Sequence, residues 1–129
     1  VYDYHAEHAE LTARQTIGTL PPGAPENTVA DIHFSPRGDR LYVSNRGHDS
    51  IATYTVAADG RLEPPVIEPC GGCWPRNFAV APDGAFLLVA NQKSDDIVVL
   101  PVQEQGAFGE TCARVALPGA SCVQFAVHP

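Results

Sequence analysis

The sequence predicts an all-β fold made of β-propeller blades, which are small four-stranded antiparallel sheets. Residues 36–51, PRGDRLYVSNRGHDSI, recur as residues 82–97, PDGAFLLVANQKSDDI, so the chain contains a repeat of 46 positions. Apolar or alternating runs of strand length are separated by turns rich in Pro and Gly, and no window has a convincing helical period. Four short strands in a repeat of about 40–50 residues are typical of a propeller blade.

The first complete unit, residues 29–74, contains four expected strands and two expected turns. The strands cover residues 30–35, 40–45, 51–56 and 66–70. Pro36 opens the first turn, where proline removes no hydrogen bond from a ladder between strands. Asp59 and Gly60 form a second turn, and residues 46–50 are a polar loop.

The second complete unit, residues 75–120, repeats this order. Its strands are expected at residues 76–81, 86–91, 97–102 and 112–117. Alternate residues of a strand face opposite sides of a sheet, so the apolar side chains of the first two strands in each unit are expected to be largely buried. These side chains are Ile32, Phe34, Leu41, Val43, Phe78, Val80, Leu87 and Val89.

Both ends of the chain resemble parts of a unit. Residues 1–20 match the end of a preceding blade, residues 20–29 form an extra loop, and residues 121–129 match the first strand of a closing blade. The chain would then hold about two and three quarter blades, whereas a closed propeller has about four to eight. Because it also begins with Val1, we expect it to be part of a longer protein, and we expect the isolated chain to self-associate through its open blade faces.

Composition excludes several classes of protein. The net charge of −7, from 15 acidic and 8 basic residues, argues against non-specific nucleic-acid binding, which needs a basic surface. No apolar run approaches the roughly 18 residues of a membrane span, and the N-terminal sequence has no signal-peptide pattern. These observations predict a cytoplasmic protein that binds neither nucleic acid nor membrane.

Four cysteines leave three chemistries open: free thiols, a disulfide or redox pair, and a metal site. Cys70 and Cys73 have CxxC spacing, but Cys112 and Cys122 are ten residues apart and supply no second half-site of the usual spacing. The prediction is that the thiols are free and that the protein uses neither a metal nor a cofactor.

Four motifs, taken in order, carry a resemblance to a known family. They are ADIH at 30–33, YVSNRG at 42–47, PRNF at 75–78 and SCVQF at 121–125. In this order they resemble the C-terminal third of the lactonase family of seven-bladed β-propellers. That family includes propeller-type 6-phosphogluconolactonases and carboxy-cis,cis-muconate lactonizing enzymes.

The resemblance implies an enzyme that acts on a small anionic lactone or carboxylate, most simply a hydrolase of a sugar lactone such as 6-phosphogluconolactone. The family carries a PRH motif, a His and a strand-ending Glu in its earlier blades, and none of these can be assigned in this sequence. We therefore expect the 129-residue chain alone to be inactive.

The geometry of a blade indicates where a site would lie. The second strand returns antiparallel to the first, so its end lies beside the start of the first strand. Arg46 ends one such strand, Gln92 is its repeat counterpart, and Arg76 starts the first strand of the next blade. Guanidinium groups bind carboxylate or phosphate through paired hydrogen bonds, so two arginines at one mouth predict an anion site.

Four residues are the predicted site. Arg46 would stabilise an oxyanion or bind a carboxylate, and by resemblance it matches a proposed catalytic position of the lactonizing enzymes. Arg76 would bind the anion, with Gln92 as a neutral neighbour. His33, expected near the same mouth, would orient a group or shuttle a proton.

Structural roles for the same residues remain open. Arg46 could bridge to Asp49, Arg76 could hold the loop between blades, and His33 could be a hydrogen-bonded structural residue. Trp74 is expected to pack a loop between blades. Three functions therefore stay in view: a lactone hydrolase, a muconate cycloisomerase, and a non-catalytic propeller that binds or scaffolds.

Overall fold

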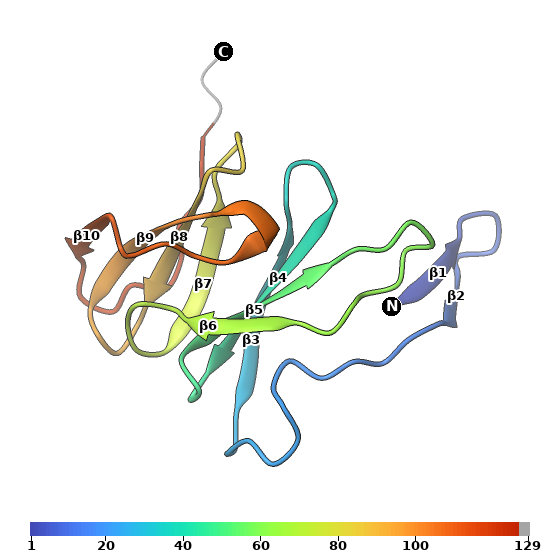
Figure 1. The fold of residues 1–129 in the computed structure, drawn as a ribbon, viewed down its shortest axis with the longest axis horizontal. Coiled ribbons are helices and arrows are strands. Elements are labelled where there is room, and N and C mark those ends of the chain that lie inside the picture. The colour runs from blue at the N-terminus through green and yellow to red at the C-terminus, as the bar shows by residue number, and fades with distance from the viewer. Residues whose placement is uncertain (127–129) are drawn as a thin grey trace.

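The computed structural model of the chain describes residues 1–126, which form strands, loops and one short 3-10 turn (Figure 1). The strands are β1 (Tyr2–His5), β2 (Glu10–Ala13), β3 (Thr28–Phe34), β4 (Arg40–Arg46), β5 (Ser50–Thr55), β6 (Val66–Pro69), β7 (Pro75–Val80), β8 (Phe86–Asn91), β9 (Asp96–Pro101) and β10 (Ala113–Ala116), with the turn η1 (Glu104–Gly106) between the last two. The all-β prediction is confirmed. No helix in this described part is long and apolar enough to cross a membrane.

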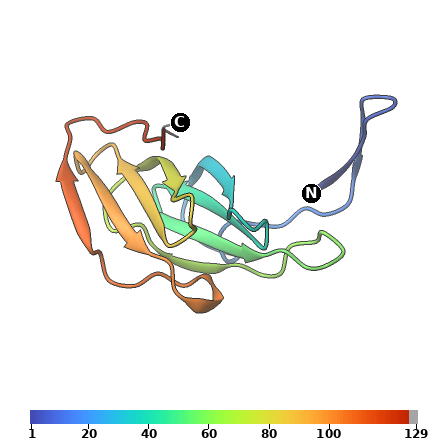
Figure 2. The same ribbon diagram turned by 90° about the horizontal axis from the view of Figure 1, so that it is seen from above.

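Two four-stranded sheets correspond to the two expected units. One has the strand order β3-β4-β5-β6 and the other β10-β9-β8-β7, and every neighbouring pair is antiparallel and consecutive in sequence. Strand β7 contacts both β3 and β4, so the sheets lie side by side as successive blades (Figure 2). The hairpin β1–β2 forms a third, two-stranded sheet that projects away from them.

The strands form where the alternation in the sequence predicts them. Strand β9, with the sequence DIVVLP, buries every second residue, because successive side chains of a strand point to opposite faces. The turns that precede β4 and β8 place Gly38 and Gly84 at φ 72° and 74°, a region that glycine enters without steric cost. The same turn chemistry therefore sets the register of both sheets.

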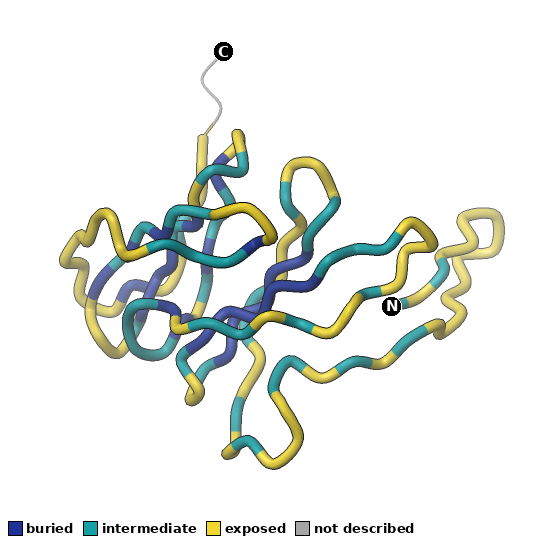
Figure 3. Tube along the Cα trace, viewed as in Figure 1, coloured by how far each residue is buried: buried dark blue, intermediate teal, exposed yellow. Residues whose placement is uncertain are grey.

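The main core lies between the two sheets and runs through their central strands (Figure 3). It contains Tyr42, Ile51, Cys70, Phe78, Leu87, Val89, Val98 and Leu100. A second buried cluster, on the other face of the first sheet, contains Leu41, Val43, Ala52 and Tyr54. Ile17 and Leu62 pack against this second cluster, so the segment after β2 covers part of that face.

The prediction of burial was wrong for two residues of β3. Ile32 and Phe34 are 57% and 59% exposed, and Val80 is only half-buried, whereas the other five predicted residues are buried. Phe78 occupies the position of Ile32 in the second blade and is fully buried against the first blade. Ile32 has no such cover within residues 1–126, since most of its side chain stays exposed. Burial on a sheet face depends on the neighbouring sheet, which alternation in the sequence does not report.

Polar contacts repeat between the first strands of successive blades. Asp31 accepts hydrogen bonds at Oδ2 from the Asn77 side chain, at 2.6 Å, and from the Phe78 backbone, at 3.2 Å. Asn77 in turn accepts from the Val123 backbone N–H at 2.7 Å. Asp31 and Asn77 are equivalent residues 46 positions apart, and the side-chain oxygen of each accepts a hydrogen bond from the segment that opens the next unit.

The expected strand at residues 121–129 lies partly outside the described residues. Residues 121–126 belong to no strand, and residues 127–129 lie outside the described residues. The Val123 N–H nevertheless donates to Asn77 Oδ1, so this segment contacts the first strand of the preceding unit. Strand pairing needs a neighbouring strand in a backbone ladder, and no strand of the described chain forms a ladder with this segment.

Candidate functional site

The strand ends meet as the blade geometry predicts. Arg46, the last residue of β4, pairs with Thr28 at the start of β3. Asn91, the last residue of β8, pairs with Pro75 at the start of β7. Arg76 sits at the irregularity in register that follows Pro75, which frees its side chain from the regular alternation of the strand.

Hydrogen bonds join three loops into one rim, here called the mouth and defined as residues 46–49, 70–76 and 92–95. The Trp74 N–H donates to Asp49 Oδ1 at 2.8 Å, and the Gln92 N–H donates to the Trp74 carbonyl at 3.0 Å. The Lys93 N–H donates to the Cys73 carbonyl at 3.1 Å. The loops of both blades therefore hold one another in place at this rim.

Arg46 makes none of the carboxylate contacts that a structural arginine normally makes. Among residues 1–126 it forms no ion pair, and its Nε is buried without a hydrogen-bond partner. Its Cζ instead lies 5.9 Å from the centroid of the Trp74 ring. The bridge to Asp49 considered from the sequence is not formed, because Asp49 accepts backbone N–H groups of Gly47 and Trp74.

The carboxylate of Asp49 is fixed by the loops around it. Burial by itself would raise its pKa, but hydrogen bonds from the Trp74 backbone, the Cys73 side chain and the Gly47 backbone outweigh that effect. The pKa of Asp49 is therefore lowered from the usual value, and Lys93 adds a smaller electrostatic contribution in the same direction. Asp49 is an ionised anchor of the mouth at neutral pH.

Arg76 and Gln92 are in direct contact. Arg76 Nη1 donates to Gln92 Oε1 at 3.1 Å, and Arg76 is exposed. A neutral amide aligns a guanidinium without neutralising its charge, so the remaining N–H groups of Arg76 are free to bind an anion. The structure thus brings together two of the four predicted site residues and places Arg46 on Trp74, two positions before Arg76.

His33 lies apart from this group. It pairs with Tyr42, whereas the mouth begins at Arg46, roughly 13 Å further along β4 at the usual rise per residue. Its Nε2 is 3.0 Å from Asp31 Oδ2, and its ring stands edge-on to Phe78 at a centroid distance of 5.0 Å. Among residues 1–126 no hydrogen bond, ion pair or aromatic contact joins it to Arg46, Arg76 or Gln92, so its role as an orienting or proton-shuttling group remains a prediction.

Trp74 and Lys93 also lie at the mouth, and neither was predicted as a site residue. Lys93 places its Nζ 3.3 Å from the centroid of the Trp74 ring, the ring that also faces Arg46. A signal for Trp74 exists in the repeat, because the second blade has Ala120 at the corresponding position, just as it has Gln92 for Arg46. Lys93 has no such signal, since its contact with Trp74 depends on how two loops fold.

The four cysteines are free thiols in the structure. Cys70 is buried, and burial raises the pKa of its thiol to about 11, which leaves it protonated and unreactive at neutral pH. The hydrogen bond with Asp49 is the main cause that raises the pKa of Cys73. No group of three or more potential metal ligands occurs within the described residues.

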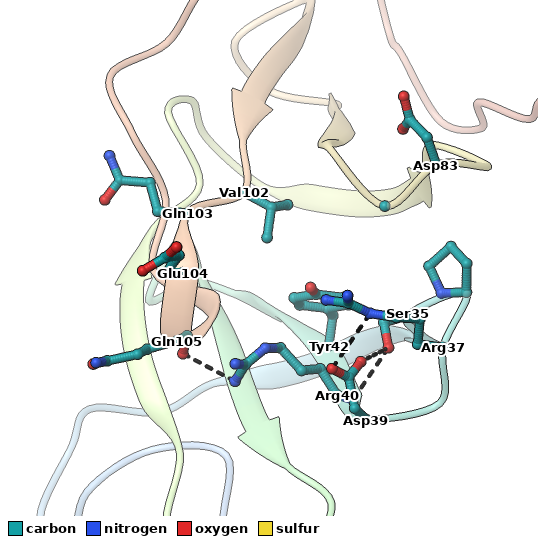
Figure 4. Close-up of a pocket in the computed structure, with 12 residues that line it drawn as sticks. Ser35, Arg37, Asp39, Arg40, Tyr42, Asp83, Val102, Gln103, Glu104 and Gln105 are labelled. Atoms are coloured by element: carbon teal, nitrogen blue, oxygen red, sulfur yellow. Dashed lines mark hydrogen bonds and ion pairs between the residues drawn. The ribbon is translucent and has the colours of Figure 1, made fainter.

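A separate cavity of about 380 Å³ lies between the hairpin turns at the other end of the blades (Figure 4). Its polar groups largely bind one another: Ser35 Oγ donates to Asp39 Oδ1 at 2.7 Å, and Arg40 Nη1 donates to the Gln105 carbonyl at 3.0 Å. The hydrogen bond from Ser35 is the main cause that lowers the pKa of Asp39. This cavity is a polar junction between the blades and contains none of the predicted site residues.

Comparison with known proteins identifies the family. The family pattern described as "Lactonase, 7-bladed beta-propeller" matches residues 1–125. A 6-phosphogluconolactonase of Formosa agariphila is 43% identical over 99 residues, which cover 74% of this chain and 28% of that protein. A 6-phosphogluconolactonase of Bacillus subtilis is 30% identical over 126 residues, which cover 95% of this chain and 36% of that protein.

Solved structures give the same result. A periplasmic gluconolactonase of Pseudomonas aeruginosa superposes with a TM-score of 0.85 at 34% identity, over 94% of this chain and 34% of that one. A Lactobacillus plantarum protein superposes with a TM-score of 0.87 at 30% identity, over 94% of this chain and 36% of that one. The chain spans about a third of the length of these relatives. It belongs to the lactonase family of seven-bladed β-propellers.

Proposed function

We propose that the complete protein hydrolyses a sugar lactone, with 6-phosphogluconolactone as the leading substrate, at the mouth that contains Arg46, Arg76 and Gln92. One observation carries the proposal: two arginines lie at one rim of a chain of net charge −7, and neither forms an ion pair within residues 1–126. Relatives named 6-phosphogluconolactonase support the substrate class.

Another arginine of the chain shows what a structural role looks like. Arg114 forms an ion pair with buried Asp96 and donates a second hydrogen bond to the Gly71 carbonyl at 2.6 Å. Its charge is thereby compensated inside the protein. Arg46 has an aromatic ring in place of the carboxylate, and Arg76 has a neutral amide. Both therefore keep an uncompensated charge that a substrate anion can meet.

The proposed chemistry assigns a role to each residue. Water attacks the ester carbonyl of the lactone, and the carbonyl oxygen becomes an oxyanion that Arg46 stabilises with its guanidinium N–H groups. Arg76 binds the phosphate or another anionic substituent, and Gln92 keeps Arg76 oriented. His33, held by Asp31, is retained as an orienting or proton-shuttling group.

The general base is proposed to come from outside residues 1–129. The register places His33 well away from Arg46, and the His and Glu expected by resemblance have no counterpart in this sequence.

We also keep the cytoplasmic location as a prediction. One solved relative is described as periplasmic, so separating cell compartments and assaying each for the protein is the direct check.

The test expresses the complete reading frame that encodes this chain and measures 6-phosphogluconolactone hydrolysis as acid release above the spontaneous rate. D-gluconolactone and carboxymuconate serve as alternative substrates. Arg46→Gln, which copies Gln92 of the twin blade, should lower kcat/KM by about 10²–10³. Arg37→Gln, at a hairpin turn with 86% of its side chain exposed, is the matched control and should leave activity unchanged.

Each alternative predicts a different result. Turnover of carboxymuconate with no lactone hydrolysis would favour the cycloisomerase, and the absence of turnover on all three substrates would favour a binding or scaffold propeller. Equal activity of wild type and Arg46→Gln would contradict the role of Arg46 while leaving the lactonase assignment intact.

A further inference from the structure

Trp74 is the single tryptophan of the chain and has an unusual backbone conformation. Its φ is 66°, in the left-handed region that bulky residues rarely occupy. The conformation is maintained from both sides, because the Trp74 N–H donates to Asp49 Oδ1 and its carbonyl accepts from the Gln92 N–H. Strained residues that are held by fixed partners cluster at functional sites, so this conformation points to a functional role for the Trp74 ring.

The Trp74 ring gathers positive charge from both blades. Arg46 comes from the end of β4 and Lys93 from the loop after β8, with their charged groups 5.9 Å and 3.3 Å from the ring centroid. The negative face of an indole attracts cations, and tryptophan is the best aromatic side chain for this contact. Two cations on one ring make an anion bound nearby favourable, because both charges attract it.

The carboxylate of Asp49 does not remove this charge. Asp49 lies close enough to Lys93 for an electrostatic effect on its pKa, but Asp49 Oδ1 already accepts the N–H groups of Gly47 and Trp74. No ion pair of Arg46 or Lys93 occurs within residues 1–126. The ring therefore fixes the cations without neutralising them, which a carboxylate in the same place could not do.

The repeat shows that the arginine and the ring go together. The first blade has Arg46 and is followed by Trp74, whereas the second has Gln92 and is followed by buried Ala120. If the ring served only to pack the loop, an aromatic residue would be expected equally after both blades. The ring is present where the cation is present and absent where the cation is absent.

We propose that Trp74 is a positioning residue, which holds Arg46 and Lys93 on its ring so that both charges face an anionic substrate at the mouth. This inference rests on the proposed function of the mouth. It makes Lys93 a third cation of the binding site, next to Arg46 and Arg76. The substrate class that suits three cations is a lactone that carries a phosphate or a carboxylate, in preference to an uncharged sugar lactone.

The experiment compares three variants of the complete protein. Trp74→Ala copies Ala120 and removes the ring, Trp74→Phe keeps an aromatic face, and Phe86→Ala removes a partly exposed aromatic ring at the opposite end of β8. We measure kcat and KM for 6-phosphogluconolactone, the calorimetric Kd of 6-phosphogluconate, and Tm. The Nε–H resonance of Arg46, assigned by its loss in Arg46→Gln, reports the ring contact directly through the ring-current shift.

Trp74→Ala should weaken 6-phosphogluconate binding about 3- to 30-fold, the range expected for loss of cation–ring contacts, and should move the Arg46 resonance toward the value of a free arginine. Gluconate, which lacks the phosphate, should show a smaller change. Trp74→Phe should stay within about threefold of wild type, because a phenyl ring retains most of this attraction. Phe86→Ala should lower Tm only.

Failure of this inference is distinct from failure of the proposed function. If wild type is active and Trp74→Ala behaves like Phe86→Ala, with a lower Tm but unchanged Kd and Arg46 resonance, then Trp74 only packs the loop and the inference is overturned. If wild type neither hydrolyses the lactone nor binds 6-phosphogluconate, the proposed function fails and this inference fails with it.

Discussion

The two complete blades have the same frame but differ at the mouth. Asn45 and Asn91 are both fully buried at the ends of their second strands. Asp49 and Asp95 adopt nearly the same left-handed conformation, with φ 57° and 54°, and accept backbone N–H groups from the segment that leads to the next blade. These shared residues build the blade. Two of the positions that differ are Arg46 against Gln92 and Trp74 against Ala120, and Arg46, Trp74 and Gln92 lie at the mouth.

Positions that are the same in both blades are required by the fold, whereas positions that differ between the blades need another explanation. A repeat reuses the same solution wherever the physical problem is the same, so shared positions report strand ends, turns and caps. An exception needs a local cause. For Asp96 in place of Ser50, the cause is the ion pair with Arg114. Arg46 has no carboxylate partner within residues 1–126 that would explain its difference from Gln92. The proposed anion site explains that difference.

The largest expected effect concerns completeness of the site, which neither blade is proposed to hold alone. The purified 129-residue chain should show no hydrolysis of 6-phosphogluconolactone above the spontaneous rate, because the general base is proposed to lie outside residues 1–129. The complete protein, assayed in parallel, is the positive control. Robust turnover by the 129-residue chain would mean that these blades contain a whole site and that the proposed division is wrong.

The second prediction compares Phe78 with Ile32, which occupy equivalent positions. Phe78→Ala should destabilise the chain by about 3–5 kcal/mol, because it opens a cavity in the core between the blades. Ile32→Ala should cost under about 1 kcal/mol in the 129-residue chain, where that side chain is 57% exposed.

Urea unfolding of both variants measures the difference, and the complete protein provides the second background. There Ile32→Ala should cost about 2–5 kcal/mol if another blade covers β3. An unchanged small cost would show that the face of Ile32 stays open.

Sedimentation of the 129-residue chain would show whether the exposed side chains of Ile32 and Phe34 lead to the predicted self-association.

The third prediction compares the two turn aspartates. Asp49→Ala should cost about 1–3 kcal/mol at pH 7, because the N–H groups of Gly47 and Trp74 lose their acceptor in a half-buried place. Asp95→Ala should cost less, because Asp95 is exposed and water can replace it.

The effect of Asp49 should also depend on pH. Its pKa in the folded state lies below the ordinary value of 3.8, so the ionised form stabilises the fold above that pH and the contribution is lost as pH falls below it. The stability difference between wild type and Asp49→Asn should therefore shrink from pH 7 to pH 3. A difference that grew on acidification would contradict this sign.

The smallest expected effect is the change in stability when Arg46 is replaced by the residue that the other blade has at this position. Arg46→Gln gives the first blade the residue of its twin and should change the free energy of unfolding by under about 1 kcal/mol. Arg46 takes part in no ion pair within the described residues. A large loss of stability in Arg46→Gln, with activity per folded molecule preserved, would show that Arg46 is structural.

Local sequence determined the strands, the turns and the pairing of equivalent positions. The predicted β8, residues 86–91, has the bounds found in the structure, and β4 differs only by including Arg46. These features depend on side-chain alternation and on residues such as Gly38 that permit a turn, both of which act over a few residues. Equivalence across 46 positions follows from the sequence for the same reason, because equal local patterns form equal elements.

Tertiary structure alone decided which side chains are covered and which charges meet. Ile32 and Phe78 follow the same strand pattern, yet only Phe78 is buried, because burial depends on a neighbouring sheet that the strand itself does not encode. Lys93 reaches the ring that faces Arg46 only because loops of two blades are hydrogen-bonded at one rim. Such contacts join residues distant in the chain, and their geometry is set by the packing of whole sheets, which no local pattern can report.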